Sequence, residues 1–223
     1  TGDKRIFSTN RLLSTIAYRL DGKTTYGLEG SIFVAGSAIQ WLRDELNFFE
    51  SAKDSEEIIS HRNVKSKVLV VPAFTGLGAP HWDPESRGSI FGLTRNTSIA
   101  DLTAATLESI AFQTKDLIGA MENDGANFSD LRVDGGMVAN NWFSQQLANI
   151  LNIDVLRPKV IETTALGASY LASMKAGLCP NLESLSSSWV SEKTFCSEEK
   201  EIKILQEKYR IWLSAVERTK GLY

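Results

Sequence analysis

The sequence predicts an α/β domain in which a mixed β-sheet is flanked by helices, and three observations support this class. Two β-prone runs near the N-terminal end flank an Asp-Gly turn, which is typical of a hairpin. After them, short apolar runs alternate with longer segments of helical periodicity, as in α/β domains. Within this alternation a Gly-Gly turn joins a strand to a helix, where backbone groups could approach a ligand closely.

The first part of the chain predicts a hairpin, a helix and a polar connection. The hairpin strands are expected at 12–20 and 24–28, around Asp21-Gly22. Apolar residues then step by three and four from Ile32 to Leu46, which predicts one helix. Residues 48–66 are polar and charged, and we expect a short helix and a loop there.

The central part predicts two strands and the longest helix. The strands are expected at 68–71 and 89–93, with a loop rich in Gly and Pro between them. Ser98 and Asp101 have the spacing of a capping box, so the helix should begin at Ser98. Apolar positions recur through Met121 and indicate one buried face.

The last part predicts alternating strands and helices. Strands are expected at 131–133 and 153–156, and helices at 139–151, 164–176 and 198–217. Gly177 has the position of a helix C-terminal signal. The complete order also fits one half of a ribonuclease H-like, actin-like ATPase, although periodicity alone fits several other α/β folds.

Composition excludes several classes of function. Of the 223 residues, 43% are hydrophobic and 23% are charged, and the net charge is −3. This weak acidity argues against a nucleic-acid partner, and no apolar run approaches the length of a membrane span. We find no secretory leader, and Cys179 and Cys196 lack the spacing of a metal pair. The expectation is a cytoplasmic protein.

Two pairs of residues stand out as a candidate ligand site. Gly36 with Gln40, and Gly136 with Asn140, each combine a bare backbone with an amide four residues later. The amide can both donate and accept hydrogen bonds. Gly36 is expected in mid-helix, at a cost of about 0.5–1 kcal/mol relative to Ala. Packing alone could also explain Gly36, a tight turn could explain Gly136, and helix capping could explain Asn140.

At this point four stretches resemble glycerol kinases, within the wider carbohydrate kinase family. They are LEGSIFVAGSAIQWLRDEL (28–46), VPAFTGLGAPHWDPESRGSIFGLTR (71–95), RVDGGMVANNWF (132–143) and ETTALGASYLA (162–172). Residues 88–108 are similar to a signature that glycerol, xylulose and gluconate kinases share. The Gly78-Ala79-Pro80 and Trp82-Asp83-Pro84 segments are more like glycerol kinases than like the other members.

The resemblance implies that residues 1–223 are the C-terminal, nucleotide-binding lobe of a two-lobed, actin-like cytosolic enzyme. Such enzymes transfer the γ-phosphoryl of ATP to glycerol with Mg²⁺, giving glycerol 3-phosphate and ADP, and are often homo-oligomers. Their catalytic aspartate and glycerol-binding residues would lie upstream of Thr1, so no catalytic or metal-binding residue is assigned here, and this chain alone should be inactive.

Residue by residue, the resemblance implies nucleotide contacts at Gly36, Gln40, Gly136 and Asn140. It also implies a small-residue helix near the hinge between the lobes, and we expect Ala168 to pack tightly against another helix or the partner lobe. Two alternatives stay open. One is another sugar kinase of the family, acting on a pentulose or a related sugar, and the other is a non-catalytic actin-like module that binds nucleotide.

Overall fold

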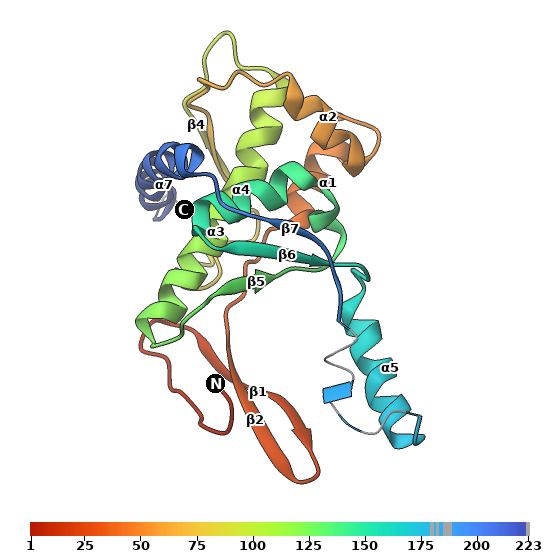
Figure 1. The fold of residues 1–223 in the computed structure, drawn as a ribbon. Helices are drawn as coiled ribbons and strands as arrows, with labels where there is room; N and C mark the ends of the chain where they lie inside the picture. Colours follow the sequence, from red (N-terminus) through yellow and green to blue (C-terminus); the bar gives the residue numbers. More distant parts are fainter. Residues whose placement is uncertain (179–180, 182, 185–188, 222–223) are drawn as a thin grey trace.

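The computed structural model describes residues 1–178, 181, 183–184 and 189–221, so Cys179 lies outside the described residues. The strands are β1 (Leu13–Leu20), β2 (Lys23–Glu29), β3 (Leu69–Val71), β4 (Ser89–Phe91), β5 (Asp130–Arg132), β6 (Asp154–Pro158) and β7 (Ser191–Phe195). The helices are α1 (Gly36–Asp44), α2 (Ser55–Ser60), α3 (Ile99–Asn123), α4 (Asn141–Leu151), α5 (Thr163–Lys175) and α7 (Glu199–Thr219), with short 3-10 helices η1 (Ala52–Asp54) and η2 (Gly136–Ala139). Figure 1 shows their arrangement.

The predicted α/β class is confirmed, with the strands divided over three small sheets. β1 and β2 form the expected antiparallel hairpin, and β3 pairs antiparallel with β4. The third sheet is mixed, because β6 pairs parallel with β5 and antiparallel with β7. Helix α4 packs on this mixed sheet, while α3 and α7 both contact β3.

Strand β7 was absent from the sequence prediction. Its central residues, Glu192 and Lys193, are both charged, and only Phe195 is buried. A strand without an apolar alternation gives no periodic signal. It forms because β6 offers a free edge, which only the folded protein provides.

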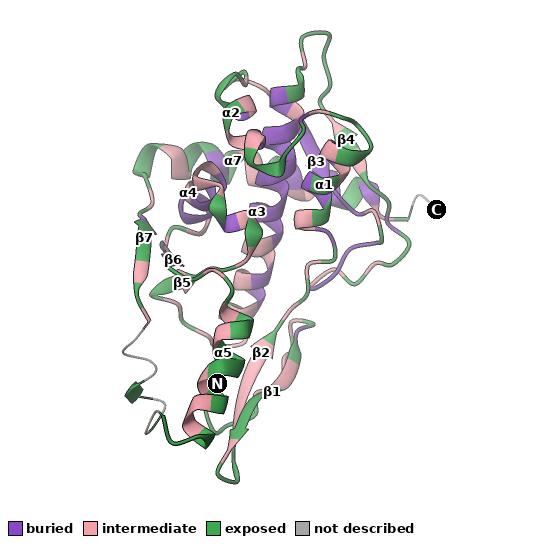
Figure 2. Cartoon of the chain, turned by 90° about the vertical axis from the view of Figure 1, so that its right-hand side faces the viewer, coloured by how far each residue is buried: buried purple, intermediate pink, exposed green. Residues whose placement is uncertain are grey.

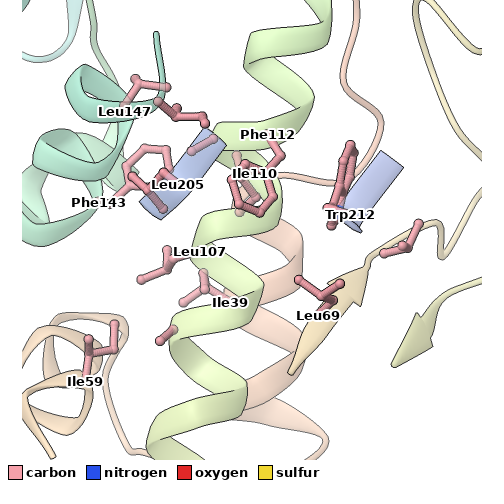
Figure 3. Close-up of a cluster of buried hydrophobic side chains, with 14 of the residues drawn as sticks. Ile39, Ile59, Leu69, Leu107, Ile110, Phe112, Phe143, Leu147, Leu205 and Trp212 are labelled. Carbon is pink, nitrogen blue, oxygen red and sulfur yellow. The ribbon is translucent and has the colours of Figure 1, made fainter. Parts of the chain in front are cut away.

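Helix α3 is the centre of the hydrophobic core. Ser98 and Asp101 form the predicted reciprocal capping box at its start. The prediction of a single buried face was wrong for its first half, where every residue from Ala100 to Gln113 is buried except Leu102. It contacts α2, β3, α4 and α7. Figure 2 shows the buried residues along α3, and Figure 3 shows large apolar side chains gathered around it.

Helix α5 differs most from the expectation. It spans the predicted residues, and Gly177 follows it with a φ of 72°. However, none of its residues is buried, and Ala168 is exposed, so no other helix in the described part of this chain covers it. Its predicted contact with the partner lobe stays a prediction. Figures 1 and 2 show α5 and the β1–β2 hairpin extending from the same end of the molecule.

The segment before β1 is attached to the C-terminal end of α3 through Asp124. The hydroxyl of Ser8, the backbone N–H of Thr9 (2.9 Å) and the side-chain amide of Asn10 (2.7 Å) all donate to its carboxylate. These hydrogen bonds lower the pKa of Asp124 from 3.8 to about 2, and the bond from Ser8 has the largest effect. The charged carboxylate therefore stabilises the folded chain.

This pKa gives a stability prediction. The unfolded chain binds a proton at Asp124 near pH 3.8, while the folded chain binds it near pH 2. The contribution of Asp124 is thus complete above about pH 5 and is lost as the pH falls from about 4 to about 2. Urea denaturation of wild type and Asp124→Ala should show a difference in unfolding free energy that shrinks across this window. A difference that does not change with pH would contradict the assignment, and exposed Glu122→Ala is the control.

Candidate functional site

All four residues predicted to form a site line one cavity of about 720 Å³. Gly36 and Gln40 come from α1, Gly136 from η2, and Asn140 from the residue before α4. The two predicted pairs are 100 residues apart in sequence, and the Cβ of a residue at position 36 would lie 3.6 Å from Met137. The remaining lining residues are Ile39, Arg43, Ser51, Ala52, Lys53, Ser55, Glu56, Leu107, Met137 and Ala139.

Gly36 does not lie in mid-helix as predicted, because it is the first residue of α1. The preceding residue, Ala35, has φ −122° and ψ −99°, which is not helical, and no side chain caps the helix. A glycine at this position avoids the cost expected in a helix interior. The first N–H groups of α1 instead point out of the helix start, where they favour negative charge.

The loop between β3 and β4 explains the late start of α1. The N–H of Ala79 donates to the carbonyl of Ser31 at 3.0 Å, and a Cβ at Gly78 would lie 2.1 Å from the same oxygen. The carbonyl of Ser31, which a helix beginning at Ile32 would use for its first intrahelical hydrogen bond, is thus bonded to this loop. The apolar spacing from Ile32 onward placed the helix start four residues too early.

The turn before η2 requires its first glycine. Gly135 has φ 83° and ψ 177°, a conformation that is open essentially to glycine alone. Its N–H donates to the carbonyl of Ile161 at 3.0 Å, which ties the turn to the segment before α5. Gly136 is different: its φ is ordinary, and a Cβ there would meet no atom within 4 Å. Its lack of a side chain leaves the cavity open.

The two predicted amides are held differently. Asn140 caps α4, since its Oδ1 accepts from the N–H of Phe143 at 2.9 Å, and its Nδ2 donates to Ser55 Oγ at 3.1 Å. Capping is thus part of its role, and one N–H and one oxygen lone pair remain for a ligand. Gln40 is exposed, and no hydrogen bond engages its side chain within the described ranges.

Charged groups are unevenly distributed around the cavity. Arg43 forms a bidentate pair with Asp44 (2.6 and 2.9 Å), and this hydrogen bonding raises the pKa of Arg43 and lowers that of Asp44. Lys53 adds a positive charge at the lining. Glu56 accepts from the N–H of Asn141 at 3.0 Å, so its carboxylate occupies the start of α4. The starts of α1 and η2 have no such carboxylate and can accept an anion.

The sequence did not predict that η1 and α2 would line part of the cavity. Residues 51–56 were expected to be a short helix and loop, without a role in the site. The Ser51–Asp54 capping box was a visible signal for the helix start, and it does form. No local pattern indicated that Ser55 and Glu56 would contact α4.

Comparison with models of protein families supplies the decisive observation. The model for the FGGY family of carbohydrate kinases, C-terminal domain, matches residues 6–176. The chain belongs to this family. Among curated FGGY relatives, the glycerol kinase of Coxiella burnetii (strain Dugway 5J108-111) is 52% identical over 219 residues, which are 98% of this chain and 44% of that protein. Glycerol kinase 1 of Pseudomonas aeruginosa PAO1 is 50% identical over 221 residues, with 99% and 44% covered.

Solved structures agree with this FGGY assignment. Plasmodium falciparum glycerol kinase with ADP has a TM-score of 0.86 and 34% identity, and the match covers 100% of this chain and 44% of that one. A ligand-bound xylulose kinase from Lactobacillus acidophilus has a TM-score of 0.84 at 22% identity, covering 100% and 45%. The resemblance to glycerol kinases and the actin-like fold class are therefore confirmed. The chain spans less than half the length of these relatives.

Proposed function

We propose that this chain is the nucleotide-binding lobe of an ATP-dependent glycerol kinase, and that the 720 Å³ cavity holds ATP or ADP. The observation that carries the proposal is the meeting of Gly36, Gln40, Gly136 and Asn140 at this one cavity. Its volume lies within the range of about 300–1,000 Å³ typical of small-molecule sites. The structure of a glycerol kinase relative was obtained with ADP, which is consistent with this ligand.

The lining suits the parts of a nucleotide. Backbone N–H groups at the starts of α1 and η2 can bind phosphate oxygens, because helix N-termini favour anions. Gly136 leaves room for this close approach. Ile39, Leu107 and Met137 supply apolar surface for a base, while Gln40 and Asn140 can bond its polar edge or the ribose.

Mg²⁺ is proposed to accompany the nucleotide. The described residues contain no group of three or more side chains that could hold a metal ion. Mg²⁺ commonly keeps several waters and binds substrate phosphates with one or two carboxylates. The residues of this chain are thus compatible with Mg²⁺ bound mainly through ATP, where it would neutralise phosphate charge.

The remaining parts of the proposal rest on the relatives. Both curated relatives named above are glycerol kinases, which supports glycerol, rather than a pentulose, as phosphoryl acceptor. We propose that glycerol binds mainly to the N-terminal part found in the full-length relatives, and that the complete enzyme is a cytoplasmic homo-oligomer. No helix in the described part of the chain has the length and apolarity of a membrane span.

A reconstitution assay tests whether phosphoryl transfer needs both this chain and the N-terminal part. Phosphoryl transfer depends on positioning and on charge stabilisation, and misplacement by about 1 Å can cost about 100-fold in rate. ADP release from Mg-ATP and glycerol should therefore be absent with this chain alone, and should arise when the N-terminal part is joined to it. The pentulose xylulose, tested as the acceptor in the same assay, is the substrate control.

Three outcomes would contradict the proposal. Glycerol-dependent turnover by the chain alone would overturn the division between lobes. Association of the two parts without formation of glycerol phosphate would favour a non-catalytic binding module. Preference for xylulose over glycerol would favour another sugar kinase of the FGGY family.

A further inference from the structure

Two neighbouring residues of α2 contact the two residues at the start of α4. Ser55 Oγ accepts from Asn140 Nδ2 at 3.1 Å, and Glu56 accepts from the N–H of Asn141 at 3.0 Å and from its Nδ2 at 3.3 Å. The paired residues are 85 positions apart in sequence. We call this group of four residues, Ser55, Glu56, Asn140 and Asn141, the α2–α4 clamp.

We propose that Ser55 and Glu56 are positioning residues of the nucleotide site, which orient the Asn140 amide and direct the phosphates away from α4. The inference rests on the proposed function. Both residues line the cavity, although neither belongs to the Gly-plus-amide pairs found in the sequence.

Ser55 determines which way the Asn140 amide faces. Its side chain is buried, with 2% of the residue exposed, and its hydroxyl donates to the carbonyl of Ala52 at 2.6 Å. The oxygen lone pair therefore points toward Asn140, where it meets an N–H group. Because Oδ1 must face Phe143 to cap α4, both ends of the amide are fixed. A ligand meets a preorganised donor and acceptor, which lowers the entropic cost of binding.

Glu56 acts through its charge. A helix start attracts anions, but the carboxylate of Glu56 already occupies the start of α4. A phosphate there would meet like charge. The start of α1 has no acidic residue in its first turn and no side-chain cap. Glu56 thus leaves the start of α1, which lines the same cavity, as the favourable position for phosphates.

Calorimetric titration with ADP tests the clamp, using a double-mutant cycle. Ser55→Ala should weaken ADP binding about 3- to 10-fold, as expected for one hydrogen bond. In an Asn140→Ser background the same change should have less than about a twofold effect, because serine still caps the helix but has no amide to orient. Glu56→Ala and Glu56→Gln should both raise the affinity for ADP relative to that for adenosine, because each removes the charge that repels a phosphate at the start of α4. Matched controls on α2 are Ser60→Ala and Glu57→Ala, at exposed residues outside the cavity.

The outcomes separate the inference from the proposed function. Equal weakening by Ser55→Ala in both backgrounds, or a lower melting temperature with unchanged ADP affinity, would overturn the positioning role while the nucleotide site stands. An unchanged ratio of ADP affinity to adenosine affinity in Glu56→Gln would overturn the role of its charge. No ADP binding by the unmodified protein would overturn the proposed function, and the inference with it.

Discussion

Replacing Gly136 by valine is expected to weaken ADP binding by about 10- to 100-fold while the protein remains folded. A Cβ at this position would meet no protein atom within 4 Å, so the side chain would extend into the cavity without a clash in the fold. It would occupy the space through which a ligand approaches the start of η2. Overpacking a tight contact costs about 1–3 kcal/mol, which corresponds to the stated loss in affinity.

Calorimetry with ADP measures this effect, and melting temperature verifies the fold. Gly119→Val is a matched control, because position 119 on α3 also has no atom within 4 Å of an added Cβ and lies outside the cavity. Unchanged ADP affinity in Gly136→Val would refute the assignment of the η2 start. Gly135→Val is a poor test, since its φ of 83° would strain the backbone as well.

Removing the indole of Trp212 is expected to cost the largest amount of stability. Trp212 on α7 is completely buried, and its ring centroid lies 5.6 Å from that of Phe112 on α3. Its Nε1–H donates to the carbonyl of Val70 on β3 at 2.9 Å, so one side chain joins three elements (Figure 3). Trp212→Ala should lower the free energy of unfolding by about 3–5 kcal/mol.

Denaturant unfolding, followed by circular dichroism, measures this loss. Trp212→Phe keeps an aromatic ring but leaves the Val70 carbonyl without the indole donor, so we expect a smaller loss of about 1–3 kcal/mol. Ile211→Ala, at a neighbouring residue that is 51% exposed, should change stability by less than about 0.5 kcal/mol. Similar losses for Trp212→Ala and Ile211→Ala would show that α7 does not anchor the core.

The tyrosine one turn before Trp212 shows how folding changes the chemistry of a side chain. Tyr209 donates its hydroxyl to Asp116, which also pairs with His81 at 2.9 Å. Burial, reinforced by the Asp116 charge, raises the pKa of Tyr209 well above its ordinary value. Tyr209 therefore stays protonated and serves as a donor that joins α7 to α3.

The sequence by itself determined those features that depend on interactions within a few residues. The Asp21-Gly22 turn, the Ser98–Asp101 capping box and the glycine after α5 act within a few residues, so each was predictable. The Gly-plus-amide pairs were also visible, because the need for bare backbone and a bifunctional amide restricts the residue type. Their common cavity came from no local pattern. The resemblance to glycerol kinases implied a common role in nucleotide binding, which stays a prediction.

Tertiary structure alone decided the rest. Helix α1 begins at Gly36, after a segment in which a loop more than 40 residues later bonds the carbonyl of Ser31. The charged strand β7 exists because β6 has an edge to pair with, and Ser55 and Glu56 reach the site because α2 packs against the start of α4. In each case the partner is distant in sequence, and the hydrogen bond requires the tertiary packing that holds the two segments side by side.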